Sequence, residues 1–463
     1  MKIKIYNSLT RQIEEFKPTR ESFVTIYSCG PTVYDHAHIG NLRTYIFEDT
    51  LRRVLKLNGY KLQHVMNITD VDDKTITRSQ KLYPNDKPEV ALKRLTQEFE
   101  KKFFEDTDIL DIDFSETKIV RATEHIDDMQ KLIQAIPNKY ITADGVYFDI
   151  AKYPDYGIFI KLDRSHEHHR VNNDEYDKDH AADFVLWKAR KEGEPAWDFE
   201  IDGKNIAGRP GWHIECAAMS VKYLGQPFDM HTGGVDLKFP HHENEIAQAR
   251  AADKKPLANF FVHAEHLLVN GRKMSKSLGN FFTLSDIKKR EIDPLAFRLL
   301  MLQSHYRSQS NFTWEAIAGA QTFLQNLRRL GDLVLQPKET GNGFNSKQLD
   351  DAKKAMLEGL GNDLNTARAL GDLAQLTDLI TALDKTSAGH IKNLLNFSDE
   401  LLGLNLSARE DIGEEIKELI VQRNHEKDLQ NYAKADALRH QLRSRNIGLN
   451  DTPHGTIWFR LDK

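Results

Sequence analysis

Two thiols in distant parts of the chain are the first candidates for chemistry. The chain contains only two cysteines, Cys29 and Cys216. Cys29 follows the apolar run 23–27, which is typical of a strand, and Gly30-Pro31 then stops that strand. A residue at the carboxyl end of a strand in an open α/β sheet faces the ligand crevice. Two buried thiols serving as small hydrophobic groups are the alternative, and a disulfide is not expected in a cytosolic protein.

An expected helix further along the chain supplies two more ligand types. His241 and Glu245 are four residues apart and share a helix face, whereas Glu243 points elsewhere. With the two cysteines they form a donor set suited to zinc. His213 and His242 are rival ligands, because each stands three residues before a member of the set. Spacing alone excludes neither of them.

The segment His38-Ile39-Gly40-Asn41 stands where the first strand is expected to lead into a helix that ends near Gly59. A helix N-terminus presents free amides and partial positive charge to phosphates. His38 could donate to a phosphate oxygen, and Gly40 leaves room for an adenine ring on the backbone. A helix start with an incidental histidine is the alternative for this tetrapeptide alone.

A second motif, Lys273-Met274-Ser275-Lys276-Ser277, follows the apolar run 260–269. Two lysines around a small hydroxyl residue, in a turn with Gly279 and Asn280, indicate a phosphate clamp. Such lysines neutralise charge that develops on a triphosphate in the transition state. A solvated basic turn is the alternative reading. Together, the two motifs predict one site that binds ATP from both sides.

Several longer blocks resemble one family of enzymes. The two motifs resemble the HIGH and KMSKS signatures of class I aminoacyl-tRNA synthetases, and the longer blocks resemble the cysteinyl-tRNA synthetase family. These blocks are residues 27–34, 67–74, 208–216, 239–245 and 451–456. The one departure is Asn41, which stands where the family signature has its second histidine. An amide still forms hydrogen bonds but cannot become cationic.

The resemblance implies an α/β fold: a Rossmann-like parallel-sheet catalytic domain with an insertion, then a helical bundle and a small C-terminal anticodon-binding domain. The expected ranges are 1–118 and 209–258 for the catalytic domain, 119–208 for the connective insertion, 259–313 for the signature-loop subdomain, 314–405 for the bundle and 406–463 for the C-terminal domain.

The resemblance also assigns roles to residues. It implies one zinc ion per subunit on Cys29, Cys216, His241 and Glu245, and amino-acid contacts at Gly30, Thr69, Trp212 and His231. We assign catalysis to His38, Asn41, Lys273 and Lys276, and ATP binding to Gly40, Asp236, Ser275 and Ser277. Without the resemblance, Trp212 and His231 could equally be an ordinary core aromatic and a buried histidine.

The expected reaction is ATP-dependent activation of L-cysteine to cysteinyl-adenylate and pyrophosphate, with Mg²⁺ on the ATP, then transfer to the 3′ end of tRNA(Cys). An apolar pocket would separate cysteine from serine by only about 1–3 kcal/mol. Zinc prefers a thiolate and therefore reads acidity and softness rather than shape. The alternatives are a purely structural zinc, a ligase that passes cysteine to a small amine, and a catalytically silent RNA-binding or zinc-sensing paralogue.

The remaining chain indicates helices and a basic end. The polar, histidine-rich stretch 165–183 is expected to be a solvated loop rather than a second metal site. Apolar periods predict one helix through Phe323 and Val334 and another from Leu370 to Leu383. Near the C-terminus, Arg439 and Arg443 on one helix face and Trp458 on a strand would suit bases of single-stranded RNA, and the resemblance implies anticodon reading there. Charge alone favours the alternative, a solvated helix.

Bulk composition is that of an ordinary soluble protein. With 463 residues, 40% hydrophobic content and a net charge of −5, the chain is expected to form two to four domains. No run of residues is apolar enough for a membrane span, and the start lacks an apolar signal region. A cytoplasmic monomer without a membrane partner is expected.

Overall fold

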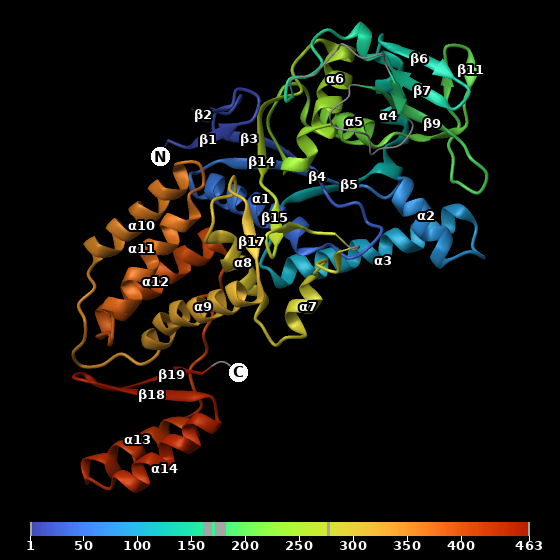
Figure 1. Ribbon diagram of the computed structural model, residues 1–463. Coiled ribbons are helices and arrows are strands. Elements are labelled where there is room, and N and C mark those ends of the chain that lie inside the picture. Colours follow the sequence, from blue (N-terminus) through green and yellow to red (C-terminus); the bar gives the residue numbers. More distant parts are fainter. Residues whose placement is uncertain (1, 161–168, 172–181, 276–277, 462–463) are drawn as a thin grey trace.

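A computed structural model describes residues 2–160, 169–171, 182–275 and 278–461. Its centre is a five-stranded parallel sheet with the strand order β14-β13-β3-β4-β5 (Figure 1). The strands are β3 (Phe23–Ser28), β4 (Lys61–Ile68), β5 (Thr117–Arg121), β13 (Phe228–Gly234) and β14 (Ala258–Ala264). The predicted Rossmann-like parallel sheet is therefore confirmed.

Helices cover both faces of this sheet, because its strands are apolar on both sides. On β3, Val24 and Ile26 belong to the core around α1, whereas Tyr27 belongs to the core around α5 and α6. The helices next to the sheet are α1 (Ile39–Leu57), α2 (Asp73–Leu82), α3 (Pro88–Ile109), α4 (Ile126–Ala135), α5 (Trp212–Leu224) and α6 (His241–Asp253). The expected helix after β3 is α1, which ends at Leu57 and is followed by its C-cap Asn58 and by Gly59, whose φ is positive.

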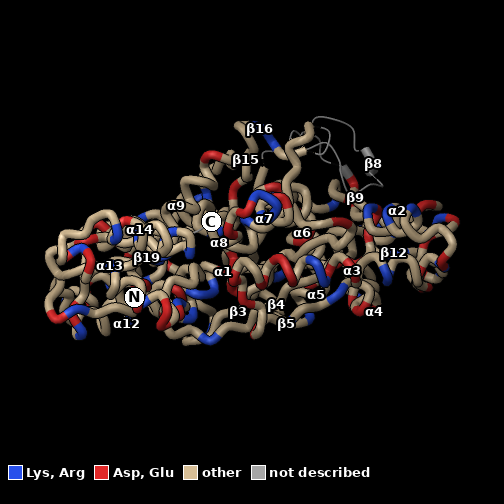
Figure 2. Tube along the Cα trace, turned by 90° about the horizontal axis from the view of Figure 1, so that it is seen from below, with Lys and Arg blue, Asp and Glu red and all other residues tan. Residues whose placement is uncertain are grey.

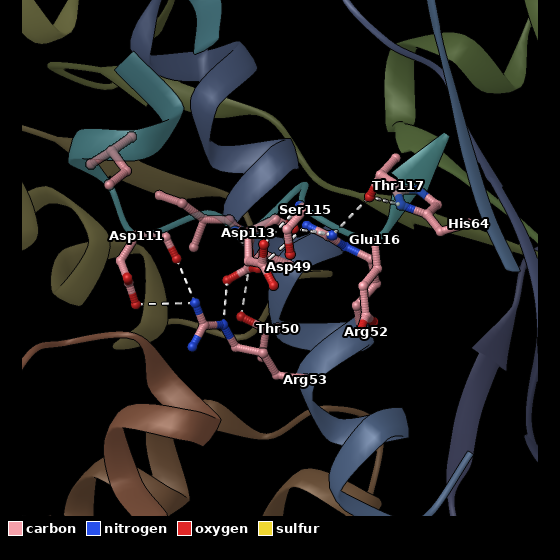
Figure 3. Close-up of polar contacts among 12 residues, drawn as sticks. Asp49, Thr50, Arg52, Arg53, His64, Asp111, Asp113, Ser115, Glu116 and Thr117 are labelled. Atoms are coloured by element: carbon pink, nitrogen blue, oxygen red, sulfur yellow. Dashed lines mark hydrogen bonds and ion pairs between the residues drawn. The ribbon is translucent and has the colours of Figure 1, made fainter. Parts of the chain in front are cut away.

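Buried charges fix α1 against the rest of the molecule (Figure 3). Asp49 on α1 accepts hydrogen bonds from Arg53 Nε at 2.7 Å and from Arg298 Nη2 at 2.5 Å. Arg298 is completely buried and also donates to the carbonyls of Leu402 and Leu110. The helix that begins at the candidate ATP site is thus held to the end of a distant helix.

Changing Arg298 to methionine is expected to lower the free energy of unfolding by about 3 kcal/mol, because it leaves buried carbonyls unpaired and removes one partner of Asp49. Denaturant unfolding would measure the loss. Arg328→Met is the matched control, since Arg328 pairs with a half-exposed Asp293, and its expected cost is below about 1 kcal/mol. Equal costs for the two variants would refute the structural role given to Arg298.

The insertion has a sheet of its own, with the order β12-β9-β7-β6 and β8 beside β9. The strands of this sheet are β6 (Lys139–Thr142), β7 (Gly145–Phe148), β8 (His169–Val171), β9 (Ala182–Ala189) and β12 (Gly208–Pro210). The insertion also contains a separate hairpin of β10 (Glu200–Ile201) and β11 (Lys204–Asn205), and the short 3-10 turns η1 (Ala122–Glu124) and η2 (Ile150–Lys152). The expected limits after residues 118 and 208 fall inside β5 and β12. Most of the polar stretch 165–183 lies outside the described residues.

The chain begins with a hairpin of β1 (Lys4–Asn7) and β2 (Gln12–Glu15). Beyond β13, short elements lead from the catalytic sheet to the helical bundle. They are η3 (Val235–Lys238), β15 (Leu267–Val269), β16 (Arg272–Lys273), α7 (Leu284–Lys288), α8 (Pro294–Leu302) and β17 (Ser310–Phe312). The bundle consists of α9 (Trp314–Val334), α10 (Ser346–Gly361), α11 (Thr366–Leu379) and α12 (Lys385–Leu402). The helix expected to reach Leu383 instead ends at Leu379, and Leu383 is buried in the loop before α12.

The C-terminal unit holds α13 (Glu414–Asp428), α14 (Tyr432–Ser444), β18 (Ile447–Thr452) and β19 (Gly455–Arg460). Trp458 is only 6% exposed and packs in the small core of this unit. The expectation that its ring is available for stacking on RNA bases was therefore wrong, because the unit needs this large side chain for its own core. Gln336, which follows the end of α9, holds the strand by hydrogen bonds to both the N–H and the carbonyl of Trp458.

The C-terminal unit and the insertion lie at opposite ends of an elongated molecule, and basic and acidic residues are interspersed along it (Figure 2). Among the helices of the described residues, none is long and apolar enough to cross a membrane.

Candidate active site and metal centre

A pocket of about 270 Å³ opens at the carboxyl ends of β3 and β13. Cys29, Gly30 and Trp212 line one part of it, and His38 and Asp236 line another. The position agrees with the rule that ligands of open α/β sheets bind at the carboxyl ends of the strands. One candidate metal ligand, Cys29, and two candidate ATP residues thus face one cavity.

The four predicted metal ligands lie together beside this pocket. Single donor atoms of Cys29, Cys216, His241 and Glu245 all lie within 4.8 Å of one another. The two sulfur atoms are 4.0 Å apart, and His241 Nε2 is 3.0 Å from Glu245 Oε1. Cys29 comes from the end of β3, Cys216 from α5 and the other two from the first turns of α6. The helix start predicted at residue 241 explains why His241 and Glu245 share a face.

Buried charges shift the protonation of this cluster. Burial alone would raise the pKa of Glu245, but the neighbouring His231 and His241 outweigh it and hold that pKa at about 2. Burial would likewise lower the pKa of His241, yet Glu245 and Cys216 raise it to about 10. The pKa of Cys29 is raised, first by burial and then by Cys216. Two thiols and a carboxylate crowded without solvent form a donor set that a divalent cation would neutralise.

Both rival histidines lie in the same cluster. His242 Nε2 is 3.3 Å from Cys29 Sγ, and a second set of donors, Cys29, His231, His242 and Glu245, is equally compact. His213 Nδ1 instead lies 2.9 Å from His241 Nδ1 and so contacts a candidate ligand. Geometry in the described residues therefore offers two overlapping ligand sets.

Glu243 points away from the cluster, as its spacing indicated. Its carboxylate accepts hydrogen bonds from the backbone N–H groups of Gly157, Ile158 and Phe159. This glutamate therefore fixes the insertion to the start of α6.

The residues expected to contact the amino acid occupy different depths. Trp212 lines the pocket and its ring lies 4.2 Å from that of His241. Thr69 and His231 are buried, at 1% and 0% exposure, and neither belongs to the described lining of the pocket. Thr69 Oγ1 donates to Glu215 Oε2, and His231 Nε2 lies 2.8 Å from Glu245 Oε2. Both thus contact residues behind the pocket wall.

A second pocket of about 220 Å³ lies between the two ATP motifs. His38, Gly40, Asn41, Lys273 and Met274 all line it, together with Asp236. A side-chain carbon built on Gly40 would lie 2.9 Å from His38 Nδ1 and 3.5 Å from Met274 Cε. The two motifs, far apart in the sequence, therefore meet across this pocket.

The loop of the second motif is fastened at its base. Asn280 accepts a hydrogen bond from Ser275 N–H through Oδ1 and donates to the Lys273 carbonyl through Nδ2. Ile39 N–H donates to the Phe282 carbonyl, so the segment after the loop packs on the start of α1. Lys276 and Ser277 lie outside the described residues.

Asn41 has a clear local role at the start of α1. His38 is the N-cap, and its Nδ1 accepts from Asn41 N–H at 3.1 Å. Asn41 Oδ1 accepts from His38 N–H at 3.2 Å, which completes a capping box. An amide oxygen serves this purpose without any charge, so the departure from the family signature leaves the helix start intact.

Two residues of the site were not predicted from the sequence. Lys74 lines the larger pocket, where its ammonium group lies 5.8 Å from the ring centre of Tyr34. His263 of β14 lies 2.8 Å from His242, Nε2 to Nδ1. Lys74 stands in a block that the resemblance already marked, whereas a contact between α6 and β14 leaves no signal in spacing.

A parallel sheet with a His-Ile-Gly-Asn helix start and a lysine loop facing one pocket defines a class I aminoacyl-tRNA synthetase. The family described as tRNA synthetases class I (C) catalytic domain matches residues 15–322. The chain is 43% identical over 484 residues to the cysteine-tRNA ligase of Brachyspira hyodysenteriae, and the match covers 99% of each chain. It is 41% identical to the Chlamydia trachomatis serovar D enzyme of the same name, covering 98% of this chain and 99% of that one. The chain therefore belongs to the cysteine-tRNA ligase family, and it is an ATP-dependent ligase.

Solved structures of other synthetases share the fold. Methionyl-tRNA synthetase of Mycobacterium tuberculosis, in complex with methionyl-adenylate, matches with a TM-score of 0.59 at 12% identity, over 83% of this chain and 92% of that one. A LeuRS-tRNA-LeuAMS complex of Agrobacterium radiobacter K84 matches with a TM-score of 0.60 at 12% identity, over 86% of each chain. At such low identity these structures support the fold alone.

Proposed function

We propose that this ligase selects cysteine through a zinc ion held by Cys29, Cys216, His241 and Glu245. The observation that carries the proposal is the position of these donors: Cys29 lines the larger pocket, and the other three are buried behind it. A metal held there would be reached from the pocket on the side of Cys29. When bound, zinc supplies a soft Lewis acid that prefers the thiolate of cysteine to the hydroxyl of serine.

The protein residues around the cluster would orient the amino acid. Trp212 stands at the pocket and stacks near His241, so it would pack on the substrate and shield the cluster from water. Gly30 approaches Asn67 so closely that a side-chain carbon there would lie 1.6 Å from the Asn67 carbonyl oxygen. Only a glycine at this position lets the chain that leaves β3 pass so close to the backbone of Asn67. Thr69 and His231 would hold Glu215 and Glu245 in place from behind.

The first reaction would be attack of the cysteine carboxylate on the α-phosphorus of ATP, which breaks the bond to pyrophosphate and forms cysteinyl-adenylate. No side chain needs to act as nucleophile, so catalysis rests on positioning and charge stabilisation. His38 and Lys273 both line the smaller pocket and would contact the phosphates. Lys276 would complete the clamp, Gly40, Asp236, Ser275 and Ser277 would hold the nucleotide, and Mg²⁺ would accompany it.

The second reaction would transfer cysteine from the adenylate to the 3′ end of tRNA(Cys). The bundle and the C-terminal unit, which follow the catalytic unit, offer the length needed to reach a distant part of a tRNA. A basic residue pair on α14, Arg439 and Arg443, remains available for this role, although Arg439 also donates to the Leu449 carbonyl. Two free thiols agree with the reducing conditions of the cytoplasm.

A second candidate ligand set has donor atoms that lie equally close together. It consists of Cys29, His231, His242 and Glu245. We favour the set with Cys216, since two thiolates bind zinc more strongly than one. His242 is also engaged with His263 on its other nitrogen.

Pyrophosphate exchange with purified protein tests the proposed function. We expect exchange with cysteine, at least about a hundredfold less with serine, and charging of tRNA(Cys) with cysteine. We also expect one zinc ion per chain by elemental analysis. Metal-free protein that still prefers cysteine over serine would overturn the role given to zinc, and exchange without charging would overturn the role of tRNA.

A further inference from the structure

A row of buried hydrogen bonds runs beneath the candidate site and crosses the sheet. His64 of β4 lies 2.9 Å from Ser28 Oγ through Nε2 and 2.8 Å from Thr117 Oγ1 through Nδ1. Ser28 Oγ is 2.7 Å from Thr232 Oγ1, which donates to Glu48 Oε1 at 2.9 Å. The row therefore links β5, β4, β3 and β13 and ends on α1.

The hydrogen bond that Thr232 donates to Glu48 assigns a direction to the other hydrogen bonds of the row, because each hydroxyl has a single proton to donate. At one end, Arg52 Nη1 donates to Thr117 Oγ1 at 3.2 Å (Figure 3). A guanidinium only donates, so the Thr117 hydroxyl proton is left to donate to His64 Nδ1. Since the Thr232 proton goes to Glu48, Ser28 donates to Thr232, and His64 donates to Ser28 through Nε2–H. All donors point from the cation toward the Glu48 carboxyl group, an arrangement in which neighbouring hydrogen bonds strengthen one another.

Burial supports this assignment for the imidazole. It lowers the pKa of His64 well below its usual value, and the charge of Arg52 lowers that pKa further. The ring is therefore neutral and carries one proton. Only the form with that proton on Nε2 satisfies both of its hydroxyl neighbours in the order given above.

One part of the row lies directly against the cysteine pocket. Ser28 immediately precedes Cys29, and Thr232 immediately follows His231. Ser28 and Thr232 are partners in the register of β3 and β13, and Cys29 N–H donates to the Thr232 carbonyl at 3.2 Å. The hydroxyl pair therefore joins the two strands at the point where they end at the metal cluster.

The other end of the row reaches the helical bundle. Arg52 Nη2 lies 3.3 Å from Asp49 Oδ1, and Asp49 also binds Arg53 and Arg298. Arg53 Nη1 donates to the carbonyl of Asp399, and Arg298 Nε donates to that of Leu402, both in the last turn of α12. The chain leaves α12 there for the C-terminal unit.

We propose that His64 and Thr117 are positioning residues for the cysteine pocket, because they hold Ser28 and Thr232 in a fixed place relative to the end of α12. The inference rests on the proposed activation of cysteine. It adds that His64 and Thr117 set the positions of the strand ends from which Cys29 and His231 reach the metal cluster.

Thr117→Val tests the proposal, since it removes one hydroxyl from a half-buried side chain and nearly preserves its shape. We expect kcat/KM for cysteine in pyrophosphate exchange to fall about tenfold, with the KM for ATP, the metal content and the melting temperature unchanged. Thr50→Val is the matched control, because Thr50 is a buried threonine on α1 whose hydroxyl donates only within the helix, to Ile46. Cysteine kinetics of Thr117→Val equal to those of Thr50→Val would overturn the proposal.

Histidine nitrogen NMR supplies a readout that does not depend on activity. We expect His64 of the wild-type protein to carry its proton on Nε2, and Thr117→Val to lose this fixed preference. A proton on Nδ1, or a doubly protonated ring, would overturn the order of the row. If the wild-type protein showed the Nε2–H form of His64 but no cysteine-dependent pyrophosphate exchange, the proposed function would be rejected, and the positioning role with it.

Discussion

Replacing His241 with asparagine is expected to lower cysteine-dependent pyrophosphate exchange roughly a thousandfold, equivalent to about 4 kcal/mol of transition-state stabilisation, while the KM for ATP changes little. His241 Nε2 lies 3.0 Å from Glu245 Oε1 inside the metal cluster, whereas the two ATP motifs meet in the adjoining smaller pocket, which His241 does not line in the described residues. An amide is a poor zinc ligand beside two thiolates, so the variant should lose the metal. Elemental analysis and steady-state kinetics with cysteine and ATP would measure both effects.

His242→Asn is the matched control for this experiment. The two histidines are neighbours on α6, equally buried, and each belongs to one of the two overlapping ligand sets. With the favoured set, His242→Asn keeps its zinc and loses much less activity than His241→Asn. If His242→Asn lost more zinc and more activity than His241→Asn, the metal would have to be assigned to the second ligand set, which contains His231 and His242. Equal loss of cysteine activation, ATP binding and folding in His241→Asn would indicate a purely structural metal.

Much of the fold could be predicted because its signals are local. The apolar run before Cys29, the helix after His38 and the helix start at His241 each follow from a few adjacent residues, and the structure has all three. The errors arose where packing decides. Trp458 was expected to face RNA, yet a unit of two helices and a hairpin needs it as core. Leu383 continues an apolar period but lies in a loop, where burial no longer requires a helix.

The candidate site divides in the same way. Cys29, Cys216, His241 and Glu245 could be predicted to assemble because their residue types and the strand end pointed to one chemistry. Spacing could not choose between His241 and His242, since both face the cluster at the start of one helix. The row through His64 and Thr117 was invisible in the sequence, because it joins five elements by one residue each. Contacts of that kind are set by sheet order and register rather than by any local pattern.

Replacing Lys273 with methionine is expected to lower kcat for pyrophosphate exchange by about 10²–10³-fold and to leave the KM for cysteine nearly unchanged. Lys273, like His38, lines the smaller pocket, where the phosphates of ATP would lie. Its charge would act mainly as negative charge develops on the leaving pyrophosphate, so the loss should be seen in kcat rather than in binding. Methionine preserves the length of the side chain and removes only its ammonium group.

Arg272→Met gives the control, because Arg272 and Lys273 are adjacent on β16 and successive side chains of a strand point to opposite sides. Arg272 is exposed and is not part of the described lining of the pocket, so its loss should change kcat less than about twofold. If both variants lost kcat equally, a general basic field around the loop would account for catalysis. A selective loss in Lys273→Met identifies a single placed charge, which the Asn280 side chain helps to fix by binding the Ser275 N–H and the Lys273 carbonyl. Because the Asn280 side chain donates a hydrogen bond to the carbonyl of Lys273 itself, Asn280→Ala should reproduce part of the kcat loss with the lysine still present.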